Sequence, residues 1–270
     1  MSSLVHHAVV PLALFIPSLL CAQVVNRAAT APEPIQPAAV SATAPSLLAL
    51  ANTSRLRPGK LTYAARLMGT GLPHRLGFRT LELTKSNYEG SPAWLLVDAR
   101  QMATVTLAES LYVTITDLTP LHRVSHSVGS DVRAEYGSDS IRVMFDGSDG
   151  EARVAMANGP GLLANLYFVE LLIGAAPLDS NWSASARLAA VGRDGKGLVP
   201  IEAHTTGQEQ IPVPDGSFDC WVVQVTMGKS QQMFWVRKSD GVVIKQRIPV
   251  IGMQGELELL LAEHGVERKE

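Results

Sequence analysis

The chain has 270 residues, and its 23 Lys and Arg side chains against 25 Asp and Glu side chains give a formal net charge of −2 at pH 7. These charges are scattered, without the basic block or stripe that binds phosphates, so we expect no nucleic acid as a partner. Beyond the N-terminal leader, no apolar run approaches the ~20 residues of a membrane-spanning helix, so we expect no transmembrane segment in the mature form.

Residues 1–22 predict a secretory signal peptide. The apolar run 8–20 is too short for a transmembrane helix and has the length of a signal-peptide core. We expect cleavage after Ala22. The alternative is a lipid-modified Cys21, against which Leu20 counts because a lipoprotein signal usually has a small residue there. The leader therefore predicts an exported protein of the periplasm or cell envelope.

Residues 23–48 are rich in Ala, Pro, Thr and Ser, a composition that predicts a flexible linker. The remaining segment, 49–266, is long enough for one large hydrophobic core, and no second linker divides it. We therefore expect a single β-rich domain. Without the leader, Cys220 is the only cysteine. An intrachain disulfide is then excluded, and we expect its thiol to be a small packed core group rather than a nucleophile.

The main pattern of the domain is an alternation of apolar and polar residues, which predicts antiparallel strands. Apolar residues alternate from Leu61 to Leu67, and a change of phase after Phe78 indicates a bulge or bend near Arg79 and Thr80. Further strands are expected at 93–98, 102–107, 111–116, 121–128, 140–145, 151–156, 183–191, 198–203, 217–226, 231–237, 242–248 and 256–261. Turn residues at 227–230 and 238–241 predict hairpins.

One segment, 161–173, has helical periodicity instead. Apolar residues recur there at helical spacing, and Gly174 and Pro177 are stop signals. Because apolar residues fill most of its circumference, we expect this helix to be buried nearly all round. More than a dozen strands and one apolar helix predict a mainly β fold, a strongly curved antiparallel sheet or partly open barrel wrapped around the helix.

No catalytic or metal-binding motif stands out in the sequence, and we expect neither a metal nor a cofactor. His122 and His126 lie in a strand pattern, where four residues separate them by about 13 Å, too far for one metal. The acidic turn 146–151 does not match the spacing of a calcium loop, and a hairpin turn explains it. Gly69-Thr70-Gly71 lacks the third glycine of a dinucleotide loop, and serine hydrolase signatures are absent.

The segments 214–223 and 234–243 resemble the C-terminal half of a bacterial family, the domain-of-unknown-function family numbered 3108. The resemblance extends through 117–120, the helix around 162–172, and 176–178. It implies an envelope protein with a curved sheet similar to that of the lipoprotein carriers of the Lol system, whose concave face holds acyl chains around a helix. It implies no catalytic residues, because the family has none assigned.

These features favour a non-catalytic binding or carrier protein for an apolar ligand or lipid. The candidate ligand-binding residues are Trp221, Phe234, Trp235, Leu162, Leu166, Tyr167 and Val169. Ordinary core packing is the alternative for each of them. The alternative functions are an envelope scaffold or assembly factor with a protein partner, and an uncharacterised hydrolase. Whether the helix fills the concave face distinguishes the carrier from the scaffold.

Overall fold

The computed structural model describes residues 44–69, 74–102, 105–148, 150–159, 161–192, 195–250 and 255–266. The predicted signal peptide, residues 1–22, and most of the predicted linker lie outside these residues. Within them, no helix is long and apolar enough to cross a membrane.

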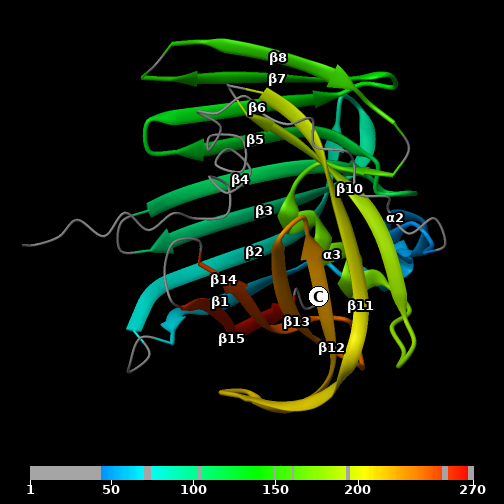
Figure 1. Cartoon of the computed structure of the whole chain (residues 1–270), viewed down its shortest axis with the longest axis vertical. Coiled ribbons are helices and arrows are strands. Elements are labelled where there is room, and N and C mark those ends of the chain that lie inside the picture. The colour runs from blue at the N-terminus through cyan, green and yellow to red at the C-terminus, as the bar shows by residue number, and fades with distance from the viewer. Residues whose placement is uncertain are drawn as a thin grey trace, which may run out of the picture.

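Nearly every strand of the described chain follows its predecessor as an antiparallel neighbour (Figure 1). The strands are β1 Gly59–Met68, β2 His74–Tyr88, β3 Ser91–Met102, β4 Val105–Thr114, β5 Pro120–Ser127, β6 Ser130–Tyr136, β7 Ser140–Gly147, β8 Ala152–Ala157, β9 Leu162–Leu163, β10 Ser183–Gly192, β11 Gly195–Val213, β12 Gly216–Met227, β13 Ser230–Arg237, β14 Val243–Pro249 and β15 Glu256–Val266. They form one sheet in the order β8-β7-β6-β5-β4-β3-β2-β1-β15-β14-β13-β12-β11-β10-β9. The prediction of a curved, incompletely closed antiparallel sheet is confirmed.

The apolar helix α3, Leu166–Ala175, lies against the concave face of the sheet (Figure 1). It begins five residues later than predicted, because Leu162–Leu163 pairs with β10 as β9. The side chain of Asn165 then caps the helix by accepting from the Phe168 backbone N–H at 2.8 Å. Its core-facing residues, Phe168, Val169, Leu172 and Ile173, are 0% exposed. The helix is therefore buried nearly all round, as its apolar pattern predicts, and it occupies most of the concave face.

Two short elements, α2 Leu47–Leu50 and a 3-10 turn at Thr53–Arg55, precede the first strand. Leu47 is fully buried in the main core. The backbone N–H of Asn52 donates to the carbonyl of Ala175 at 3.0 Å. This N-terminal segment therefore packs beside the C-terminal end of α3.

The phase change in β2 has a different position from the predicted one. Ala65 pairs with Gly77 but Arg66 pairs with Arg75, so Leu76 is the extra residue of a bulge. Gly77 has φ +149°, and a Cβ there would lie 2.0 Å from the Gln101 carbonyl oxygen. The bulge thus forms where only glycine lets β2 approach β3 so closely, three residues before Arg79.

Two strand predictions also differ from the structure. The expected strand at 102–107 spans a reversal, since β3 ends at Met102 and β4 begins at Val105. Strand β6 was not predicted, because it carries few apolar residues. Both hairpins expected after β12 and β13 are confirmed by the antiparallel pairing of their flanking strands.

The two ends of the sheet meet through side chains. A small apolar cluster joins β6 and β7 to β9 and β10, and it contains Ala134, Ile141, Val143, Phe145, Leu162 and Ala189. The Lys196 ammonium of β11 also donates to the Ala155 carbonyl on β8. The main core lies between α3 and the rest of the concave face and includes the fully buried Cys220. The two ends of the sheet are thus joined by side-chain contacts rather than by backbone hydrogen bonds between paired strands.

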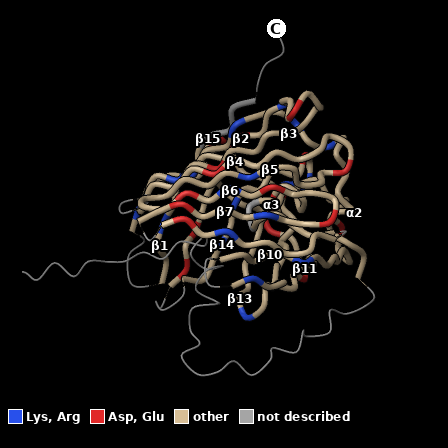
Figure 2. Tube along the Cα trace, turned by 90° about the horizontal axis from the view of Figure 1, so that it is seen from above, with Lys and Arg blue, Asp and Glu red and all other residues tan. Residues whose placement is uncertain are grey.

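Basic and acidic positions intermingle along the strands in the view of Figure 2. This arrangement agrees with the scattered charges of the sequence.

Candidate functional site

Four charged side chains form a buried network beneath α3. Arg79 donates from Nη2 to Asp98 Oδ2 at 3.0 Å and from Nη1 to Glu170 Oε2 at 2.6 Å. Arg100 Nη2 donates to the same Asp98 oxygen at 3.0 Å. All four residues are at most 4% exposed. Two positive and two negative charges therefore compensate each other inside the sheet, as buried charges require.

Asp98 is the centre of this network. Burial acts to raise its pKa, but Arg100 and Arg79 outweigh that effect and hold the pKa below its ordinary value. Asp98 lies on β3 directly opposite Glu109 of β4, so two carboxylates face each other across one strand pair. The arginines on both sides make this arrangement stable.

Tyr63 extends the network to β1. Its hydroxyl is within hydrogen-bonding distance of Glu170 Oε1 at 3.1 Å and of the Val243 carbonyl at 3.0 Å. Burial and the nearby Glu170 carboxylate raise the pKa of Tyr63 well above its ordinary value. Tyr63 therefore stays a neutral phenol, and its single hydroxyl proton is shared between these two acceptors.

The N-terminal end of α3 is held by a second group of polar side chains. Asn165 donates to Glu109, which also lies 3.4 Å from Arg123 Nε. The Tyr136 hydroxyl donates to the Ala164 carbonyl at 3.3 Å. Polar contacts thus fix the helix at its start and at Glu170, so its position inside the sheet is specified by more than apolar packing.

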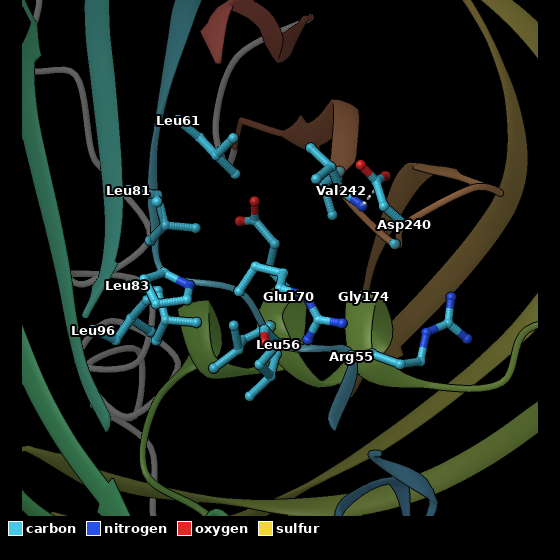
Figure 3. A pocket seen from close by; sticks show the side chains of 16 residues that line it. Arg55, Leu56, Leu61, Leu81, Leu83, Leu96, Glu170, Gly174, Asp240 and Val242 are labelled. Carbon is cyan, nitrogen blue, oxygen red and sulfur yellow. Dashed lines mark hydrogen bonds between the residues drawn. The ribbon is translucent and has the colours of Figure 1, made fainter. Parts of the chain in front are cut away.

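A cavity of about 180 Å³ remains between α3 and the concave face of β1–β3 (Figure 3). Its apolar wall is formed by Leu61, Leu81, Leu83, Leu96, Leu171 and Val243. An engineered apolar cavity of about 150 Å³ binds benzene, whereas drug-sized ligands need roughly 300–1,000 Å³. The space therefore suits a single ring or a short alkyl segment.

The cavity has a polar border. Arg55, Arg57 and Asp240 line it, and Arg57 and Asp240 are exposed, so the cavity reaches solvent on that side. The Arg55 guanidinium donates to the Ala176 carbonyl at 2.9 Å. Glu170 extends from α3 toward Leu61, between Leu81 and Val242 (Figure 3). A ligand would thus meet leucines around its body and one buried carboxylate at its inner end.

Five of the seven residues proposed from the sequence as ligand contacts have described side chains, and these five lie outside the cavity. Val169 and Phe234 are buried in the main core, and Leu162 belongs to the small cluster between the sheet ends. Trp221 is half-buried, with the Lys238 ammonium 4.3 Å from its ring centroid. Nothing is described of the side chains of Leu166 and Tyr167. None of the five described side chains lines the cavity.

Trp235 is buried in the main core together with Phe234. Its indole N–H donates to Glu209 Oε2 at 2.6 Å, and the Lys245 ammonium lies 3.7 Å from its ring centroid. Burial lowers the pKa of Lys245. Polar and cation–π partners thus occupy the side chain of Trp235.

Sequence reasoning missed Glu170 and the leucines of β1–β3 as a group. The available signal was Glu170 itself, the one charged residue in the α3 sequence LYFVELLIGA. A charge in an otherwise apolar helix predicts a buried partner.

The two histidines considered as metal ligands each pair with a carboxylate on β6. His122 Nδ1 lies 2.8 Å from Glu135 Oε1, and His126 Nδ1 lies 3.0 Å from Asp131 Oδ1. Among the described residues, no group of three or more His, Cys, Asp or Glu side chains is placed to hold a metal ion. These histidines thus make cross-strand contacts on the outer face.

Comparison with protein families finds that the model described as "Protein of unknown function (DUF3108)" matches residues 62–258. This range runs from β1 into β15 and includes α3 and most of the cavity wall. A comparison with curated protein sequences finds no match.

Among solved structures, the chain is similar to a beta-barrel-like protein of domain of unknown function DUF1849 from Brucella abortus, with 12% identity and a TM-score of 0.51 over 79% of this chain and 100% of that one. The hypothetical lipoprotein YmcC from Escherichia coli (K12) is 13% identical, with a TM-score of 0.33 over 77% of this chain and 88% of that one. At such identities the first likeness concerns the fold alone.

Proposed function

The chain belongs to the DUF3108 family, in agreement with the resemblance found in its sequence, and from this starting point we propose that it is an exported, non-catalytic binding or carrier protein for a small apolar ligand. One observation carries the proposal, the leucine-lined cavity between α3 and β1–β3. Export is supported by the predicted signal peptide at residues 1–22.

Leucines from three adjacent strands converge on this space. Leu81, Leu83 and Leu96 are each at most 7% exposed and line the cavity wall. An apolar group inserted there gains about 0.8 kcal/mol for each buried methylene. Because α3 fills the rest of the concave face, the ligand is a ring or a short alkyl segment rather than a whole diacyl lipid.

A non-catalytic role is supported by the engagement of the polar groups near the cavity. Glu170 and Tyr63 bond to each other, and Arg79 bonds to both Asp98 and Glu170. A catalytic site needs several acid, base or nucleophilic groups open to substrate, and of these four residues only Glu170 lines the cavity. The buried network therefore serves to hold α3 beside the cavity.

A second candidate, an envelope scaffold, is favoured by an aromatic cluster on the outer face. The ring centroids of Tyr88 and Tyr112 are 5.2 Å apart, and those of Tyr88 and His122 are 5.5 Å apart. Aromatic residues are enriched in protein interfaces. Substituting Tyr112 with Ser is expected to abolish binding of a protein partner without changing ligand binding.

The carrier proposal is tested on the exported chain purified after removal of its leader. Native mass spectrometry is expected to find a co-purifying small molecule, and NMR titration is expected to show saturable binding of toluene. Leu83→Phe narrows the cavity and is expected to weaken binding. The control Leu188→Met conserves volume at a buried position that does not line the cavity and leaves binding intact. Absence of both a co-purifying molecule and toluene binding would refute the proposal.

A further inference from the structure

Glu170 has unused hydrogen-bonding capacity inside the cavity. Its carboxylate accepts from the Tyr63 hydroxyl at Oε1 and from Arg79 at Oε2, and among the described residues no other group donates to it. An ionised carboxylate has about four acceptor positions. Roughly two of them are therefore left for another donor.

These acceptor positions belong to a side chain that the ligand would meet. Glu170 is 4% exposed and lines the cavity, and Figure 3 shows it extending into the space between Leu81 and Val242. A purely apolar ligand would cover the carboxylate without satisfying it, which is costly in a dry site. A ligand with a donor at its inner end would avoid that cost.

The charge balance of the network selects the kind of donor. Arg79 and Arg100 already compensate Asp98 and Glu170. An ammonium group would leave an uncompensated positive charge, and a carboxylate or phosphate would bring a like charge against Glu170. Only a neutral donor completes the hydrogen bonds and keeps the buried charges equal.

We propose that the cavity selects a small apolar ligand whose inserted end carries a neutral O–H or N–H donor, which hydrogen-bonds to the free acceptor positions of Glu170. This inference rests on the proposed binding function and adds the ligand class to it. The leucines recognise the apolar body, and Glu170 determines which end of the ligand enters first.

Four probes of similar size test the proposal at pH 7, with dissociation constants measured by NMR titration. Toluene has no donor, benzyl alcohol adds a neutral hydroxyl, benzylamine adds an ammonium group, and benzoate adds a carboxylate. Benzyl alcohol is expected to bind about tenfold more tightly than toluene, since a hydrogen bond to a charged group is worth that much. Benzylamine and benzoate are expected to bind more weakly than toluene.

Two variants test whether Glu170 causes the preference for benzyl alcohol over toluene. In Glu170→Gln the preference for benzyl alcohol over toluene is expected to fall to about threefold or less, since an amide oxygen accepts more weakly than a carboxylate. The matched control is Glu258→Gln, another buried carboxylate that pairs with an arginine, Arg247, but does not line the cavity. The control retains the full preference.

The outcomes separate the two proposals. Equal binding of toluene and benzyl alcohol by the unmodified chain overturns the role of Glu170 and leaves the binding function standing. Tighter binding of either charged probe also overturns it. If no probe binds, the cavity takes no ligand of this size and both proposals fail. The unmodified chain gives these answers even if Glu170→Gln does not fold.

Discussion

Gly174 at the end of α3 and Gly241 in the β13–β14 turn touch through their backbones. A Cβ on Gly174 would lie 2.5 Å from the Gly241 carbonyl oxygen, and a Cβ on Gly241 would lie 1.9 Å from that of Gly174. Both residues also line the cavity. The absence of two side chains thus sets how closely the C-terminal end of the helix approaches the sheet beside the candidate site.

Gly241→Ala is therefore expected to destabilise the chain by more than about 2 kcal/mol, because the strained backbone and the collision with α3 add. Gly90→Ala is the matched control, since Gly90 has φ +82° against +80° at Gly241 but no atom within 4 Å of its Cβ position. It is expected to cost only about 1 kcal/mol. Urea unfolding measures both, and equal losses would contradict the role of the helix contact.

Leu83→Phe and Leu111→Phe test the free space beside Leu83. Both leucines are buried, but only Leu83 lines the cavity. Overpacking a filled core costs about 1–3 kcal/mol, whereas filling a cavity is neutral or stabilising by up to about 2 kcal/mol. The melting temperature is thus expected to fall for Leu111→Phe and to stay unchanged or rise for Leu83→Phe. A similar fall in both variants would show that no space exists beside Leu83.

The lowered pKa of Asp98 predicts how the stability of the fold changes at low pH. Because its folded pKa is lowered, its contribution is present above the ordinary carboxyl pKa of about 4 and is lost as the pH falls through the folded value. Asp98→Asn is expected to cost about 3–5 kcal/mol at pH 7, since two buried arginines lose their shared anion. The variant should also lose less stability than the unmodified chain as the pH falls below about 4.

Urea unfolding at a series of pH values measures this response. Glu202→Gln, which replaces an exposed carboxylate, serves as the control. Its stability is expected to show the same pH dependence as that of the unmodified chain. An Asp98→Asn variant whose acid response equals that of the control would disprove the assignment.

Cys220 is expected to be unreactive in the folded protein. Its side chain is fully buried, and burial raises the pKa of its thiol to about 11. In the chain without its leader, iodoacetamide at pH 8 should therefore leave the native thiol unmodified and alkylate it completely in guanidinium chloride. Val128→Cys, at a position that is 85% exposed, provides a reactive control. Rapid modification of native Cys220 would exclude a packed core role.

Alternation along the chain was sufficient to predict most strands, because the period of two is a local property of an extended backbone. The bulge at Leu76 was misplaced since nothing local marks it except Gly77, whose need for glycine arises from the approach of Gln101 on the next strand. The helix start was misplaced because Leu162–Leu163 pairs with Arg187 and Leu188, which are 25 residues away in sequence.

The candidate site was the part least accessible to sequence reasoning. The aromatic residues of β12 and β13 were the visible apolar signal, but Trp235 bonds to Glu209 and Phe234 packs in the core. The buried carboxylate of the cavity, Glu170, is bonded instead by Arg79, a contact across 91 positions. Such a contact follows from strand order and register, which a single sequence does not encode locally.

The sequence by itself determined a mainly β domain with one apolar helix, because composition and periodicity are properties of neighbouring residues. Its motifs resembled those of the family, and its leader predicts export. Only the tertiary structure decided that the helix fills the sheet, that a small space remains beside Leu83, and that a buried carboxylate projects into it. The physical reason is that cavities and compensated charges are made by side chains distant in sequence, whose packing is set by the whole sheet.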